Sequence, residues 1–93
     1  ASRPANATVA TVATSTTSAV LFASNAARRQ VFVYNDSNST LYVAFAATTT
    51  SAAFTVLIPK NGFWGGMLNG YTGAISGILD NGTGNARVTE VTT

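Results

Sequence analysis

Short runs of β-branched and aromatic residues recur along this chain, and clusters of turn-forming residues separate them. Val31–Tyr34 and Leu41–Phe45 are two such runs, and the polar stretch Asn35–Thr40 lies between them. Successive side chains of a strand point to opposite faces of a sheet, so these runs place large residues on both faces. Two strands joined by a polar loop are typical of an antiparallel hairpin. We therefore expect this stretch to form a central hairpin in which neither face is left fully to water.

The same pattern continues through the rest of the chain. Further strands are expected over residues 8–14, 19–23, 53–58, 63–68, 71–80 and 85–92. Gly73 and Gly77 lie within one of these segments, and glycine inside a strand marks a bulge or a close approach of another group. No segment has the 3.6-residue apolar period and the caps of a helix. The sequence thus predicts an all-β fold, a small antiparallel β-sandwich or barrel of seven to eight short strands.

The first seven residues differ in character from those that follow. Residues 1–7 have no apolar periodicity, and Pro4 cannot donate a hydrogen bond to a sheet. We expect residues 1–7 to form an extended N-terminal arm and residues 8–93 to form a single β-sandwich or barrel domain. A chain of this length buries roughly two-thirds of its unfolded surface, which suffices for one core. The expected core residues are Phe32, Val33, Val43, Phe45, Val56, Ile58, Ile75 and Val88.

Side chains that commonly serve catalysis and metal binding are nearly missing from the sequence. The chain contains no Cys and no His, and its carboxylates are Asp36, Asp80 and Glu90. Metal sites with thiolate ligands and cysteine nucleophiles are therefore excluded, and side chains that act as general bases are scarce. Asp36 and Asp80 also lie in sequences typical of turns. We expect a protein that is not an enzyme, with no catalytic residues, no metal and no cofactor.

The low charge of the chain favours association with other protein subunits. Charged residues make up 9% of the sequence, against about 25% in ordinary soluble domains. A surface with so few charges is poorly protected against association. Residues 8–14 and 85–92 are expected at open sheet edges, where strands of another copy could pair. We therefore expect the chain to bind copies of itself, as a dimer or trimer.

Nucleic acid and membrane are not expected partners. The five basic residues are scattered, whereas nucleic-acid binding requires a clustered basic face. No stretch approaches the ~20 consecutive apolar residues of a membrane-spanning helix.

Four residues are candidates for contacts with a protein partner. Arg3 and Pro4 belong to the expected arm, where the Arg3 guanidinium could bind a carboxylate of a neighbouring subunit. Alternatively, the arm is a frayed terminus that binds no partner. Arg28 and Arg29 precede the first strand of the expected hairpin and could anchor a partner's carboxylate. Alternatively, this pair flanks a strand and discourages edge pairing.

Aromatic residues offer a different hypothesis. A carbohydrate-stacking platform could be built from Tyr34, Tyr42, Phe63, Trp64 and Tyr71. In small β-domains such residues more often belong to the core, with the tyrosine hydroxyls reaching the surface.

Three segments form a distinctive set. They are RRQVFVYNDS at 28–37, YTGAISGILD at 71–80 and GNARVTEV at 84–91. In content and order they resemble a family of small β-rich structural proteins of tailed bacteriophages, over most of the chain from Val9 to Thr92. Members of that family occur as small free head proteins and within larger tail or fibre proteins.

The resemblance implies a non-enzymatic component of the virion. The leading expectation is a capsid decoration, or cement, protein on the capsid surface, assembled in the cytoplasm of the bacterial host. Such a protein binds between subunits of the major capsid protein and stabilises the phage head. A tail or fibre module that contacts the host surface is the first alternative. A carbohydrate-binding β-domain is the second, and it depends on the aromatic residues alone.

Overall fold

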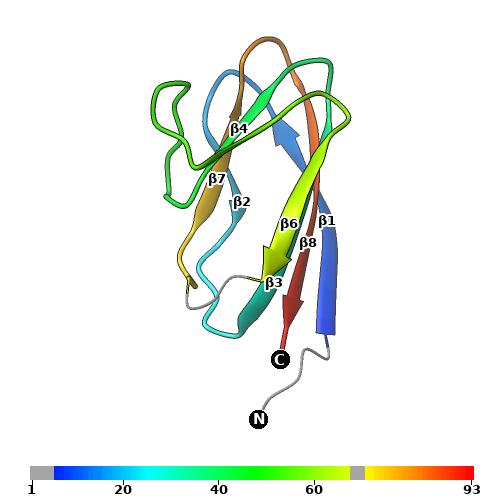
Figure 1. Cartoon of the computed structure of the whole chain (residues 1–93), viewed down its shortest axis with the longest axis vertical. Helices are drawn as coiled ribbons and strands as arrows, with labels where there is room; N and C mark the ends of the chain where they lie inside the picture. Colours follow the sequence, from blue (N-terminus) through cyan, green and yellow to red (C-terminus); the bar gives the residue numbers. More distant parts are fainter. Residues whose placement is uncertain (1–5, 68–70) are drawn as a thin grey trace.

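The computed structural model describes residues 6–67 and 71–93, and these form two antiparallel four-stranded sheets that pack face to face (Figure 1). The strands are β1 (Asn6–Thr14), β2 (Ala19–Phe22), β3 (Arg28–Asp36), β4 (Leu41–Ala44), β5 (Val56–Ile58), β6 (Phe63–Met67), β7 (Ile75–Leu79) and β8 (Gly84–Thr92). Sheet A has the order β1-β8-β3-β6, and sheet B has the order β2-β7-β4-β5. The described residues contain no helix. The predicted all-β sandwich is confirmed.

The core lies between the two sheets and is built from the inward-facing residues of both. Its buried members are Leu21, Phe22, Val31, Val33, Leu41, Val43, Ile58, Ile75, Leu79, Ala86 and Val88. Burial of each large aliphatic side chain contributes about 1.5–3 kcal/mol. Leu21 and Leu41 lie directly over the backbone of Gly77, where a side chain would crowd them. The close approach expected at this glycine is thus confirmed.

The predicted central hairpin is wrong. β3 pairs with β6 and β8 in sheet A, whereas β4 pairs with β5 and β7 in sheet B. The polar residues between the two strands therefore carry the chain from one sheet to the other. Both strands have one fully buried face, and those two faces meet across the core instead of lying side by side in one sheet.

Most of the expected core residues are buried, but Phe32 is not. Val33, Val43, Ile58, Ile75 and Val88 are buried, and Phe45 and Val56 pack against the core while partly exposed. Val31 and Val33 occupy the inner face of β3, so strand alternation turns Phe32 to the outer face, where it is 37% exposed.

Two further expectations need correction, one about which strands lie at the sheet edges and one about where the N-terminal arm ends. β8 lies between β1 and β3 and is not an edge strand, although β1 is at an edge as expected. β1 begins at Asn6, so Asn6 and Ala7 of the expected arm belong to the strand. Arg3, Pro4 and the rest of that arm lie outside the described residues.

Candidate interaction surface

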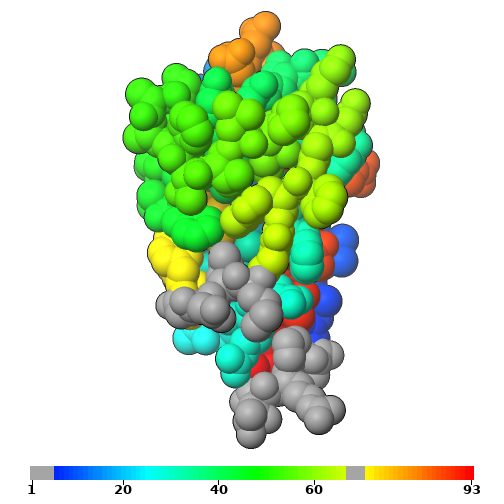
Figure 2. All heavy atoms as spheres, viewed as in Figure 1, coloured from blue at the N-terminus to red at the C-terminus, as the bar shows by residue number. Residues whose placement is uncertain are grey.

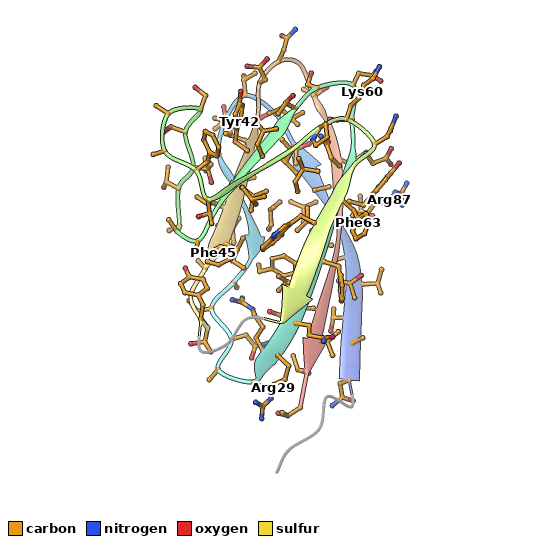
Figure 3. The ribbon with its side chains drawn as sticks, viewed as in Figure 1. Arg29, Tyr42, Phe45, Lys60, Phe63 and Arg87 are labelled. Carbon is orange, nitrogen blue, oxygen red and sulfur yellow. The ribbon has the colours of Figure 1, made fainter. Side chains whose placement is uncertain are left out.

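The outer face of sheet A presents aromatic side chains on neighbouring strands. Tyr34 of β3 lies opposite Phe63 of β6, and Phe32 lies opposite Gly65. Phe63 is 73% exposed, and Phe32 and Tyr34 are each 37% exposed. Figure 3 shows Phe63 projecting outward from β6, near Arg87. We call Phe32, Tyr34 and Phe63 the aromatic face.

Gly65 fixes the shape of the aromatic face. The Phe32 ring lies so close over Gly65 that a side chain at this position would collide with the ring and with the Val31 carbonyl. The glycine therefore lets Phe32 lie down across the sheet. Phe63 has no such cover and stands out from the surface as its most exposed aromatic side chain.

An ion pair borders the aromatic face. Arg87 of β8 lies opposite Tyr34, and its Nε donates to Asp36 Oδ2 at 2.9 Å. The side chains of Arg87 and Asp36 are 59% and 38% exposed, so solvent screens their attraction to at most about 1 kcal/mol. An apolar centre with a charged and hydrated border is the usual composition of a protein–protein interface.

Arg28 is an internal residue. Its side chain is 0% exposed, and its Nε donates to Glu90 Oε2 at 2.8 Å. The two terminal nitrogens donate to the Gly73 and Ala23 carbonyl oxygens, both at 2.7 Å. The guanidinium also lies 5.6 Å from the centre of the Phe22 ring. All three guanidinium nitrogens of Arg28 therefore donate to acceptors within the domain.

A β-bulge in β3 explains why Arg28 is buried while the neighbouring Arg29 is exposed. The pairing of β3 with β8 shifts by one residue between Arg28 and Gln30, and Arg29 is the additional residue. Residues three apart normally face opposite sides of a sheet, but this shift lets Arg28 and Val31 both face inward. Arg29 is exposed at one end of the molecule, far from Lys60 (Figure 3).

Of the four predicted partner-binding residues, the structure describes Arg28 and Arg29, and these two have opposite environments. Arg28 is enclosed within the domain, Arg29 is exposed, and Arg3 and Pro4 lie outside the described residues. A partner contact by Arg29 or by the arm stays a prediction. Sequence reasoning missed the aromatic face because it assigned Phe32 to the core, although the alternation with Val31 and Val33 carried the signal.

The five aromatic residues considered for carbohydrate stacking are dispersed over the molecule. Tyr71 stacks on Phe45 with ring centres 4.9 Å apart, and Trp64 packs beside the same ring at 5.7 Å. Tyr42 of sheet B packs against Phe54 of the following loop, with ring centres 4.9 Å apart. Of the five residues, only Tyr34 and Phe63 lie together on the aromatic face. The five residues therefore do not form the platform of the carbohydrate hypothesis, and Trp64 and Tyr71 pack against the core, as the alternative interpretation expects.

A polar hollow at one end of the sandwich is a second surface feature. It has a volume of about 410 Å³ and is lined by residues 38–40, Pro59, Lys60, Asp80 and Asn81. The Ser39 hydroxyl already donates to the Asn81 carbonyl at 2.6 Å. Within the described part of the chain, no three acidic, histidine or cysteine side chains come close enough to hold a metal ion. This hollow is lined by turn residues that bond to one another.

The comparisons with known proteins add no relatives. Searches of family models, curated proteins and solved structures returned no significant match to this chain. Across residues 6–67 and 71–93, there is no helix of the length and apolarity needed to cross a membrane.

Proposed function

We propose that this chain is a non-enzymatic structural protein of a tailed-phage virion. In this proposal it is a decoration protein that binds between subunits of the major capsid protein and stabilises the head. The assignment to a phage depends on the resemblance of the segments at 28–37, 71–80 and 84–91. The observation that supports a binding role is the aromatic face on the outer side of sheet A.

The aromatic face has the properties of a preformed docking surface. Phe32 and Tyr34 belong to β3, a strand bonded on both sides, so the surface costs little ordering on binding. Aromatic residues are enriched at protein interfaces and often contribute most of the binding energy. Phe63 is the natural anchor because it is the most exposed residue of the aromatic face.

Sheet B presents a less continuous outer surface. Segment 45–55 folds over part of it, where the Thr49 and Ser76 hydroxyls share a hydrogen bond and both residues are buried. Figure 2 shows this segment in green, beside the yellow-green β6. The exposed apolar residues of this side, Val20, Phe54 and Leu57, come from β2, a loop and β5. Sheet A is therefore the better docking surface.

A binding assay on phage heads that lack the protein tests this proposal. Phe63→Ser should leave folding unchanged, because Phe63 is 73% exposed, and should weaken head binding about 30-fold, the effect of losing ~2 kcal/mol at an interface anchor. Leu57→Ser, on the outer face of sheet B, is the matched control and should bind like the unmodified protein. Full binding by the Phe63 variant, or loss only in the Leu57 variant, would contradict the proposal.

Copy number separates the head assignment from the tail or fibre alternative. A decoration protein is present in amounts comparable with the major capsid protein, whereas a tail part is a small fraction of it. Quantitative gels of purified virions give this ratio directly. A ratio typical of a tail part would replace the capsid by the host surface as the partner.

A further inference from the structure

The four edge strands of the sandwich are β1, β2, β5 and β6. They differ in how readily another strand could pair with their open backbone groups. β2 has four residues and an irregular pairing between Val20 and Phe22. β5 has three residues and is followed by Pro59 and Lys60. β6 has five residues and contains Gly65 and Gly66. Short strands, irregular pairing, Pro and Lys all hinder the addition of a further strand.

β1 has none of these protections. It pairs residue for residue with β8 over nine positions, from Asn6 opposite Thr92 to Thr14 opposite Gly84, without a shift. Its sequence, NATVATVAT, has no charge, no proline and no glycine. Residues 6–11 are exposed, and among the described residues no strand pairs with the other side of β1. A long, regular and uncharged edge of this kind is a template for another strand.

We propose that β1 pairs with β1 of a second copy of this chain, antiparallel, about a two-fold axis through Ala10. This inference needs only the edge of sheet A and does not depend on the proposed function. An axis at the middle residue overlaps all nine positions of both strands. Ala10 then faces Ala10, Val9 faces Thr11, Thr8 faces Val12, Ala7 faces Ala13, and Asn6 faces Thr14.

The hydrogen-bonding pattern explains why the axis passes through a residue. In an antiparallel sheet, residues that bond to one neighbouring strand alternate with residues whose N–H and C=O point to the other side. A two-fold axis through Ala10 places residues that point to the open side opposite one another in the two copies. An axis between two residues would instead place them opposite residues already bonded to β8.

The chemistry of β1 favours a second copy as the occupant. Each pair in this register joins small, β-branched or polar uncharged side chains, so no bulky groups and no like charges meet. Such pairs suit a pleated surface. Among the described residues, the charged side chains nearest to β1 are on β8, and the two β8 strands would lie three strand spacings apart, about 14 Å. This separation exceeds the Debye length of ~8 Å at physiological salt, so repulsion between them is weak.

The dimer would have a defined surface. Pairing through β1 joins the two A sheets into one continuous sheet with β6 at each outer end. The two-fold axis makes this a closed dimer, and because the axis is perpendicular to the sheet, the same face of sheet A points the same way in both copies. The two aromatic faces would therefore lie on one side of the joined sheet.

Cysteine cross-linking tests both the interface and its register, because the chain has no cysteine of its own. Opposed Cα atoms in an antiparallel pair lie about 4.5–5.5 Å apart, which a disulfide can span. Ala10→Cys should therefore form a disulfide-linked dimer almost completely under mild oxidation. Thr8→Cys is the matched control on the same face of β1. The two copies of that cysteine would lie about 14 Å apart along the strands, so cross-linking should stay at background.

Sedimentation measures the same interface without a covalent bond. The unmodified chain should sediment as a dimer at high micromolar concentration. Ala10→Lys places two charges opposite each other and should give a monomer, whereas Ala52→Lys, in an exposed loop, should leave the dimer intact. A mixture of Ala10→Lys and Ala10→Glu chains should restore the dimer. The proposal is overturned by an unmodified monomer, by cross-linking through Thr8→Cys in place of Ala10→Cys, or by an Ala10→Lys dimer.

Discussion

Two arginines of sheet A form nearly the same ion pair on opposite faces of one sheet. Arg28 reaches Glu90 on the inner face with its Nε at 2.8 Å, and Arg87 reaches Asp36 on the outer face with its Nε at 2.9 Å. Their surroundings differ, since the Arg28 side chain is 0% exposed and the Arg87 side chain is 59% exposed. Burial, and not the length of the contact, therefore decides what each pair contributes to stability. The inner face of sheet A contributes to the core, and its outer face carries exposed side chains, which our proposal assigns to partner binding.

The largest expected effect is on the inner face, at Arg28. Arg28→Ala should lower the free energy of unfolding by about 3–5 kcal/mol, because it leaves Glu90 without its buried partner. It also removes the donors to the Ala23 and Gly73 carbonyls. Chemical denaturation of the purified variants measures this change.

The neighbouring arginine supplies the control for that experiment. Arg29→Ala removes the same type of side chain one residue further along, at an exposed position, and should change stability by less than about 0.5 kcal/mol. Equal effects of the two substitutions would refute the distinction between the inner and outer faces.

A smaller effect is expected at Asn35, the buried amide of the inner face. Its Nδ2 donates to the carbonyl oxygens of Ser39 and Ile58, at 2.7 and 3.0 Å, and its Oδ1 accepts from the Ser37 hydroxyl. Asn35→Ala should cost about 1–3 kcal/mol, because these buried groups lose their partner. Thermal unfolding measures this change, with Asn38→Ala at an exposed position as the control. A shift in melting temperature no larger than that of the control would count against the role of Asn35.

The smallest effect is expected at the outer ion pair. Arg87→Ala should lower stability by no more than about 1 kcal/mol, and the difference should shrink as salt is added. Denaturation at low and high ionic strength tests this expectation. A large loss that is insensitive to salt would show that the outer face also supports the fold.

The sequence predicted the strands better than it predicted their pairing. Alternation and turn residues located β3 and β4, but a polar loop between two strands has the same composition whether it closes a hairpin or crosses between sheets. The hydrogen bonds that determine which strands pair join residues that are distant in sequence. Asn35, for example, fixes the crossing by bonding to Ile58, which no local pattern reveals.

The candidate surface shows a similar limit. Arg28 and Arg29 were both predicted to contact a partner, yet the bulge at Arg29 and the partner Glu90 determine which of them is buried. Phe32 was assigned to the core from its size, although Val31 and Val33 already filled the inner face of that strand. Hydrophobicity alone does not distinguish a core face from a binding face.

A density map of the intact virion tests the central claim most directly, because it shows which face of the sandwich meets the capsid. The account predicts density for the sandwich on the head surface, with Phe63 and Tyr34 buried against the major capsid protein and sheet B turned outward. A sandwich found only in the tail, or one bound to the head with Phe63 facing solvent, would contradict it.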